Sequence, residues 1–113
     1  MINITITKKN QDIITIEAKG HSGYASEGSD IVCSAISVLT QNLINSLIQI
    51  VKISPDYVID DSAPYLYVSI PKGLKGKLYS DSQILMQSTE LGIKDVANSY
   101  KKYIKIKEKQ YDD

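Results

Sequence analysis

The sequence predicts an α+β fold: a two-layer sandwich with the order β-β-α-β-β-α-β and two helices on one face of the sheet. Three observations predict it. Short segments that alternate apolar and polar residues come in pairs, a long segment with helical periodicity separates the pairs, and a second helical segment precedes a last short alternation. Hairpins on either side of a helix favour one mixed or mostly antiparallel sheet.

The first pair of predicted strands lies at the start of the chain. Residues 2–7 alternate isoleucine with asparagine or threonine, which is the pattern of a half-buried strand. The next alternation places Ile14, Ile16 and Ala18 on the face that we expect to be buried. Polar residues between the two segments predict a turn, and therefore a hairpin.

The first predicted helix runs from an N-cap at Asp30, with Ser29 a near-equal candidate, to Ser54, because the residue before Pro55 is pushed out of the helical region. Polar residues interrupt its apolar stretch, which favours a buried helix over a membrane span. Its expected core face has helical spacing: Val32, Ala35, Ile36, Leu39, Leu43, Leu47 and Ile50. Other apolar residues widen this face, so we expect a second surface, such as a partner subunit, to cover it: Ile31, Val38, Ile44, Ile48 and Val51.

The second half of the chain repeats the pattern of strands before a helix. Residues 56–61 and 65–71 predict two strands, the second with Leu66, Val68 and Ile70 on one face. A loop follows, and we expect the second helix to start at a cap among residues 80–82. Its expected core face is Leu85, Ile93, Val96 and Tyr100, and it contains Gly92, a poor helix former. Alternation at residues 104–107 predicts a last strand, and residues 108–113 are expected to form a frayed tail.

Composition bounds the class of protein. The chain has 113 residues, which suits a single domain over residues 1–113 with a core that needs no disulfide or metal. Lysine plus arginine and aspartate plus glutamate are 13 each, so the net charge is zero and we expect no direct nucleic-acid binding. The single cysteine fits a reducing, cytoplasmic location, and the start of the chain shows no secretory signal.

The candidate site lies in the segment "GHSGYASEGSDIVC", which holds the only histidine, His21, and the only cysteine, Cys33. If Asp30 caps the helix, Cys33 lies in its first turn, where N–H groups and the helix dipole favour a thiolate. The loop before it allows His21 to reach the sulfur and to act as general base and then acid. N–H groups of the helix start and the loop would hold the oxyanion of a tetrahedral intermediate.

Composition and spacing alone leave other interpretations open. A lone cysteine on an apolar helix is commonly a small buried hydrophobe, and a lone histidine in a loop is commonly plain surface. An exposed thiol of low pKa would also suit a redox sensor. One cysteine and one histidine fall short of the four ligands of structural zinc, so we expect no metal and no cofactor.

The motif resembles that of the ribosomal-processing cysteine protease (Prp) family. The family's hallmark is Gly-His, a loop, then Gly-x-Asp-Ile/Val-Val-Cys-Ala with a serine one helical turn beyond the cysteine. The matching residues are Gly20, His21, Gly28, Asp30, Ile31, Val32, Cys33 and Ser37. Ser22 and Ser34 stand where alanine is common in the family, and these small substitutions leave the proposed chemistry intact.

The resemblance implies a specific function. Family members are cytoplasmic homodimeric endopeptidases that remove an N-terminal extension from the precursor of large-subunit ribosomal protein twenty-seven, cutting after aromatic residues. Carried over, Cys33 is the nucleophile and His21 is the general base and acid. Asp30 either caps the helix or orients His21, and Ser37 bonds either to the Cys33 carbonyl or to a substrate or partner group.

The glycines of the segment favour a mobile loop. Gly20, Gly23 and Gly28 lie among other small residues, so the segment can change shape at little steric cost. We therefore expect a mobile loop that orders over the substrate and brings His21 to Cys33. Tyr24 is a candidate for the lining of a pocket for the aromatic side chain.

A second hypothesis comes from a different class of protein: a non-catalytic, ribosome-associated binding module with the same fold. Its only support is a group of lysines near the end of the chain, at positions 101, 102, 105, 107 and 109. We expect these lysines instead to form a solvated strand edge, where lysine discourages pairing with other chains.

Overall fold

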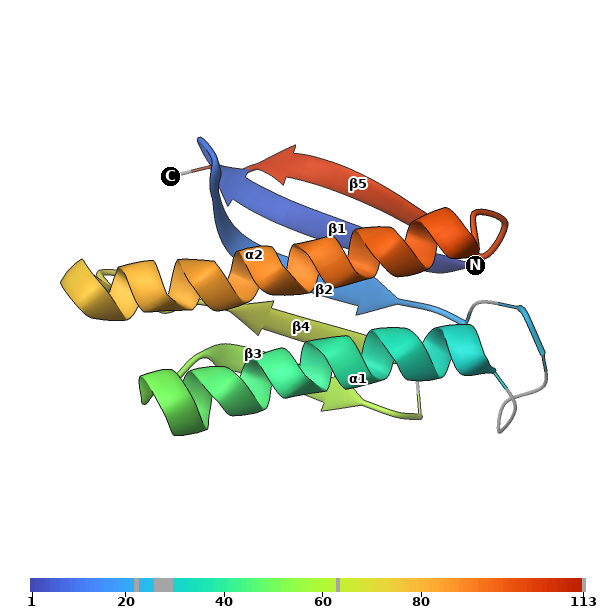
Figure 1. Ribbon diagram of the computed structural model, residues 1–113, viewed down its shortest axis with the longest axis horizontal. Coiled ribbons are helices and arrows are strands. Elements are labelled where there is room, and N and C mark those ends of the chain that lie inside the picture. Colours follow the sequence, from blue (N-terminus) through green and yellow to red (C-terminus); the bar gives the residue numbers. More distant parts are fainter. Residues whose placement is uncertain (22, 26–29, 63, 113) are drawn as a thin grey trace.

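The computed structural model describes residues 1–21, 23–25, 30–62 and 64–112. It contains one five-stranded sheet with two long helices lying side by side on one face (Figure 1). The elements are β1 (Ile2–Lys9), β2 (Asp12–Lys19), α1 (Ile31–Ser46), its π-helical extension η1 (Leu47–Val51), β3 (Asp56–Asp60), β4 (Tyr65–Ser69), α2 (Gly76–Ser99) and β5 (Ile104–Gln110). The predicted α+β sandwich and its element order are confirmed.

The sheet is mixed, with the strand order β3-β4-β2-β1-β5. Neighbouring strands are antiparallel except for β1 and β5, which pair in parallel from Ile2 opposite Ile104 onward. The first strand of the chain is therefore an interior strand, whereas β3 and β5 form the two edges.

The predicted alternation holds in β1 and fails at one point in β2. Ile2, Ile4 and Ile6 are buried as expected, but Ile13, and not Ile14, is the fully buried residue at the start of β2. The register shifts by one residue between Thr7 and Lys8, so that Ile14 is an extra residue, a β-bulge. A bulge reverses the side-chain alternation, and strict period two cannot reveal it.

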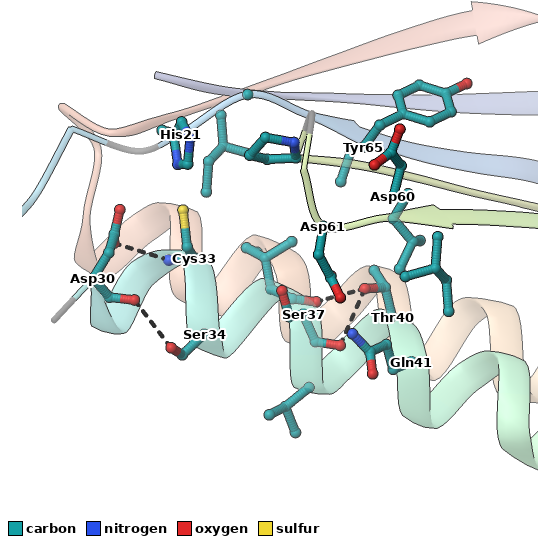
Figure 2. A pocket seen from close by; sticks show the side chains of 18 residues that line it. His21, Asp30, Cys33, Ser34, Ser37, Thr40, Gln41, Asp60, Asp61 and Tyr65 are labelled. Atoms are coloured by element: carbon teal, nitrogen blue, oxygen red, sulfur yellow. Dashed lines mark hydrogen bonds between the residues drawn. The ribbon is translucent and has the colours of Figure 1, made fainter. Parts of the chain in front are cut away.

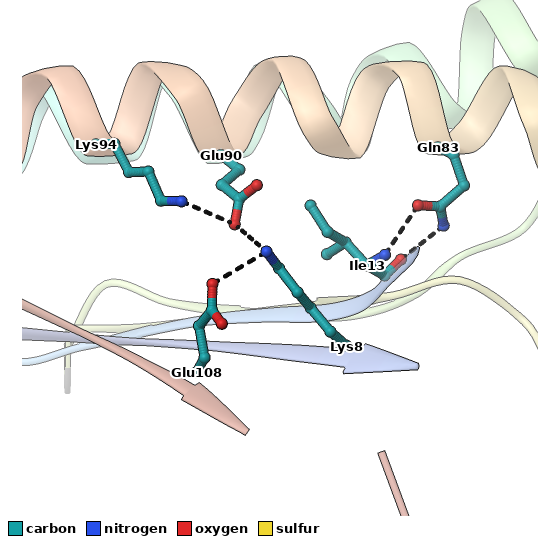
Figure 3. Close-up of polar contacts among 6 residues, drawn as sticks. All are labelled: Lys8, Ile13, Gln83, Glu90, Lys94 and Glu108. Atoms are coloured by element: carbon teal, nitrogen blue, oxygen red, sulfur yellow. Dashed lines mark hydrogen bonds and ion pairs between the residues drawn. The ribbon is translucent and has the colours of Figure 1, made fainter. Parts of the chain in front are cut away.

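The Gln83 side chain of α2 holds the backbone next to this bulge. Its Oε1 accepts the Ile13 N–H at 2.8 Å, and its Nε2 donates to the Ile13 carbonyl at 2.8 Å (Figure 3). The buried amide thus supplies both hydrogen bonds that a neighbouring strand would otherwise provide.

The first helix starts where the sequence predicts and ends earlier. Asp30 is its N-cap, and Val32, Ile36, Leu43 and Leu47 are buried. The helix ends at Val51, before Lys52 in a left-handed conformation, and not at Ser54. Ile50, predicted to be in the core, is 71% exposed because the wider π-helical turn directs Val51 inward instead. Thr40 takes a fully buried position that the apolar pattern missed.

The stretch Ile31–Val51 is long and apolar enough to cross a membrane by length and composition, with a mean hydropathy of 1.6. Core helices of globular proteins share these properties, and here the inner face shares one core with buried strand residues and packs against α2. Its outer face keeps exposed apolar residues at Ile31, Val38, Ile48 and Ile50. The predicted wide apolar face is therefore covered on one side only in the described chain.

The second helix begins at Gly76, earlier than the predicted caps. Ser82 lies inside the helix, and its hydroxyl donates to the Leu78 carbonyl at 2.7 Å. Tyr79, which precedes the predicted caps, already lies in the helix, and its hydroxyl donates to the Asp12 carboxylate at 2.6 Å. The prediction placed the start too late because this contact joins residues far apart in sequence.

Gly92 lies where α2 approaches α1 closely. A Cβ at this position would lie 2.9 Å from Leu39 Cδ2, so the absence of a side chain lets α2 pack closely against α1. The predicted core residue Ile93 is fully buried, whereas Leu85, Val96 and Tyr100 are partly buried against the core.

An ion-pair cluster joins α2 to the sheet. Lys8 Nζ lies 2.9 Å from Glu90 and 3.0 Å from Glu108, and Lys94 reaches Glu90 at 3.5 Å (Figure 3). Glu108 belongs to β5, which extends to Gln110, so the prediction of a frayed tail was wrong for these residues. The partners of Glu108 and of the β5 backbone lie on β1, at the opposite end of the sequence.

Candidate active site

Gly20 fixes the backbone just before His21. Its N–H donates to the Pro64 carbonyl at 3.0 Å, and its φ is +97°, which an L side chain rarely adopts. A Cβ there would lie 2.8 Å from the Met1 carbonyl oxygen. These contacts require glycine at the end of β2 and set the position from which His21 projects.

Cys33 lies in the first turn of α1, as predicted, and is half-buried. The Asp30 carboxylate caps this turn, with Oδ1 accepting the N–H groups of Val32 at 3.1 Å and Cys33 at 3.0 Å. The Ser34 N–H donates to the Asp30 carbonyl at 3.1 Å. These three N–H groups are therefore engaged, and the expectation that helix-start N–H groups hold an oxyanion is wrong for them while the cap is in place.

The cap also affects the electrostatics of the thiol. The helix dipole favours a thiolate at Cys33, but the Asp30 carboxylate brings negative charge to the same turn. The two effects oppose each other. Activation of the sulfur therefore has to come mainly from a neighbouring base.

His21 and Cys33 line the same pocket, which has a volume of about 470 Å³. In Figure 2 the imidazole ring, from the end of β2, and the thiol, from the first turn of α1, face each other across it. His21 is exposed, so its ring is accessible to a molecule that enters the pocket. The structure thus brings together the predicted nucleophile and the predicted base.

Further pocket walls come from the β3–β4 region, which the motif did not indicate. Asp60, Asp61 and Tyr65 line the pocket opposite α1 (Figure 2). The Tyr65 hydroxyl donates to Glu17 at 2.7 Å, and this hydrogen bond raises the pKa of Tyr65 to about 12. Tyr65 therefore stays protonated at neutral pH. The signal that could have found this wall is the acidic pair at the end of a predicted strand.

One known protein family matches most of the chain. The family described as "Cysteine protease Prp" matches residues 1–105. The chain belongs to the Prp family of cysteine proteases. This family assignment places the chain in that enzyme class.

Individual relatives support the assignment. The "Ribosomal processing cysteine protease Prp" of Bacillus subtilis is 23% identical over 94% of this chain and 96% of its own length. The structure of the Staphylococcus aureus Prp protease with a covalently linked product peptide has a TM-score of 0.84 at 21% identity, covering 96% and 100% of the two chains. SMU.848 from Streptococcus mutans gives a TM-score of 0.83 at 26% identity, covering 98% and 96%.

Within this Prp-family fold, Asp30 and Ser37 occupy different places at the site. Asp30 is buried and caps α1, which is the structural one of its two predicted roles. Ser37 is exposed and lines the pocket, while its carbonyl accepts the Thr40 hydroxyl at 3.3 Å. The role of the Ser37 hydroxyl stays a prediction.

The predicted mobile loop is only partly within the described residues. Gly23 has a φ of +77°, and a Cβ added there would meet no atom within 4 Å, whereas Gly28 lies outside the described residues. Tyr24 packs edge-to-face against Tyr100 and Tyr103, with ring centroids 5.6 and 5.2 Å apart, and is not among the pocket-lining residues. The loop hypothesis therefore stays a prediction. Across residues 1–21, 23–25, 30–62 and 64–112, no group of three potential ligands could hold a metal ion.

Proposed function

We propose that this protein is a cysteine endopeptidase that removes the N-terminal extension from the precursor of large-subunit ribosomal protein twenty-seven, cutting after an aromatic residue. The observation that carries the proposal is the placement of Cys33 and His21 on facing walls of one pocket. The Bacillus subtilis relative, named a ribosomal processing protease, and the Staphylococcus aureus protease solved with a substrate peptide support the choice of substrate class.

The proposed mechanism uses a Cys-His dyad. The Cys33 sulfur attacks the carbonyl carbon of the scissile bond, and His21 takes the thiol proton and delivers it to the leaving amine. An acyl-enzyme remains on the sulfur. Water then attacks the thioester while His21 takes a proton from it, the C–S bond breaks, and His21 returns that proton to the sulfur.

The pocket suits an extended peptide with an apolar residue at the cut. Its volume of about 470 Å³ lies within the range of ligand sites. Apolar side chains that line it include Ile2, Ile36 and Leu66, all buried. These side chains would favour burial of an aromatic ring beside the thiol.

The direct test is cleavage of a peptide that carries the precursor's N-terminal extension, with the products identified by mass spectrometry. We expect cleavage by the wild type at one bond after an aromatic residue, and none by Cys33→Ala or Cys33→Ser. A peptide with the aromatic residue replaced by alanine is the matched control. Intact peptide after incubation with the wild type, together with tight binding to ribosomes, would favour the non-catalytic binding module.

We also propose that the protein is a cytoplasmic homodimer. The support is an apolar surface on the side of α1 and the edge strand β3, where Val38 is 68% exposed and Tyr57 and Val58 are each 48% exposed. Val58→Lys would place a charge on this surface and is expected to convert a dimer to a monomer in light scattering. A wild type that is monomeric at micromolar concentration would contradict the proposal.

We also propose that the loop of residues 22–29 orders over the substrate. Hydrogen exchange with the substrate peptide and the Cys33→Ala variant tests it, because this variant binds without turning over. We expect amides within residues 22–29 to gain protection on binding. Equal protection with and without peptide would remove the hypothesis and leave the dyad proposal standing.

A further inference from the structure

The face of the sheet that carries no helix presents a row of lysines on β5. The alternation of β5 turns Ile104 into the core, and Lys105, Lys107 and Lys109 are all exposed. The parallel register sets these lysines beside Asn3, Thr5 and Thr7 of β1, which are neutral residues. We call Lys105, Lys107 and Lys109 the lysine row.

The lysine row differs from the lysine on the covered face. Lys8 lies between two carboxylates, Glu90 and Glu108, at 2.9 and 3.0 Å (Figure 3). In the part of the chain that the structure describes, the lysine row forms no ion pair. The charge of Lys8 is therefore neutralised under α2, whereas the three lysines of the row are exposed on the opposite face of the sheet.

The spacing of the row suits a polymer of negative charges. Alternate residues of a strand lie about 6.7 Å apart on one face, so the three ammonium groups form a line and do not converge on a single point. Lysine binds phosphate as a point charge and needs no fixed geometry. Lys101 and Lys102, both exposed, continue the positive charge in the turn before β5. A line of cations matches a phosphodiester backbone better than one small anion.

A hollow of about 330 Å³ lies beside the Lys109 end of the row. Thr7, Thr15, Tyr67 and Tyr111 line it. The Thr15 hydroxyl also donates to Ser69 Oγ at 3.1 Å, and Lys9 Nζ lies 5.7 Å from the centroid of the Tyr111 ring. Aromatic side chains on a sheet stack against unpaired bases, and hydroxyl groups bond to base edges or to the ribose 2′-OH. These groups are the kind that single-stranded RNA recognition uses.

The same hollow contains negative charge, which determines how a strand would lie. Glu17 and Asp112 also line it, and Glu17 accepts the Tyr65 hydroxyl at 2.7 Å. A phosphate would be repelled from this hollow, whereas a neutral base would not. The phosphates would therefore follow the lysine row, and a base would enter the hollow.

We propose that the open face of the sheet binds single-stranded RNA, with phosphates along the lysine row and a base between Tyr67 and Tyr111. This departs from the expectation based on net charge, because the fold separates the charges: the row lies on the edge strand β5, and Asp56 and Asp60 lie on the opposite edge strand β3. The end of β3 lines the Cys33 pocket, so RNA and a peptide can be bound at the same time.

The test is fluorescence anisotropy with a labelled single-stranded RNA of about twelve nucleotides, within the site sizes of sheet-based single-strand binders, at several salt concentrations. The variant K105Q/K107Q/K109Q is expected to bind at least about tenfold more weakly. The slope of log K against log salt concentration should become less steep by about two, since each phosphate contact contributes about 0.7 to this slope. The matched control is K52Q/K72Q/K75Q, which removes the same charge from exposed lysines outside the row. We expect it to weaken binding less than about threefold. Tyr67→Leu should weaken binding about tenfold by removing one stacking surface.

Three results would overturn the inference: no RNA binding by the wild type, equal weakening by the two triple variants, or tighter binding to duplex RNA or to anionic lipid vesicles than to the single strand. A lysine row that only protects the strand edge from pairing predicts the first result. Peptide cleavage is measured on the same preparations. Unchanged cleavage by the row variant shows that its fold is intact, and RNA binding without peptide cleavage would leave this inference standing while the proposed function fails.

Discussion

The two helices cover the same face of the sheet and contribute differently to the molecule. α1 begins at a carboxylate cap and presents Cys33 at its first turn, whereas its inner face is mostly apolar. α2 begins with no side-chain cap and buries Gln83 and Glu90, which bind the backbone and a side chain of the strands. α1 presents the candidate nucleophile at its N-terminus, whereas α2 stabilises the sheet through buried polar side chains within the helix. Substitutions in the two helices should therefore have separable effects.

The largest effect is expected on activity, from the loss of the histidine that faces the first turn of α1. His21→Ala removes the base that faces Cys33 and should lower kcat/KM by about 10²–10⁴, the range of general acid–base catalysis. The alkylation rate of Cys33 at pH 7 should fall as well, because less thiolate forms.

The control for this variant is its stability. His21 is exposed, so the free energy of unfolding in urea should stay within about 0.5 kcal/mol of the wild type. An unchanged alkylation rate in His21→Ala would contradict the dyad, whatever happens to cleavage.

The second-largest effect is expected at α2, where stability should fall and activity should stay unchanged. Lys8→Met leaves the mostly buried Glu90 carboxylate without its nearest cation, which should cost about 2 kcal/mol of unfolding free energy. Peptide cleavage at 25 °C should be unchanged. The matched control is Lys94→Met, whose more exposed lysine reaches Glu90 only at 3.5 Å and should cost less than about 0.5 kcal/mol. Equal losses in the two variants would show that the cluster does not depend on Lys8.

A smaller effect separates the two roles of Asp30. Asp30→Ala should cost about 1 kcal/mol of stability because the cap of α1 is lost, whereas asparagine can replace aspartate as a cap. If capping is its role, Asp30→Asn keeps both stability and peptide cleavage. A stable Asp30→Asn variant with a large loss of kcat would instead assign Asp30 to the positioning of His21.

The smallest effect concerns the acid limb of stability. The hydrogen bond to Lys8 lowers the pKa of Glu108 from 4.5, so its stabilising contribution is present above pH 4.5 and is lost as the pH falls toward the lowered pKa. Glu108→Gln should remove this dependence. The difference in unfolding free energy between wild type and variant should be larger at pH 7 than at pH 3; an equal difference at both would contradict this assignment.

The sequence predicted most of the fold because most elements follow from local patterns. The alternation in residues 2–6 and the cap at Asp30 depend on neighbours in sequence, and both are confirmed. The bulge at Ile14 and the start of α2 were not predictable this way. They depend on Gln83, which is 70 residues from Ile13, and on Tyr79, which is 67 residues from Asp12.

The same distinction between local and long-range contacts applies to the site. His21 and Cys33 could be found because both lie in one short motif, and the structure places them at one pocket. The opposite wall, with Asp60, Asp61 and Tyr65, lies outside this motif. Its only sequence signal is the acidic pair at the end of a predicted strand, and the pairing of β4 with β2 brings it to the site. The charge separation across the sheet was likewise invisible in a composition with zero net charge.

The parallel pairing of β1 with β5 has a consequence for the protein during its synthesis. β1 is made first, yet one of its two neighbours is made after all the other elements. The chain therefore cannot close its sheet while residues 104–110 are still inside the ribosome, and its longest-range contacts form last. A newly made copy therefore completes the layer that supports its thiol only once residues 104–110 lie outside the ribosome.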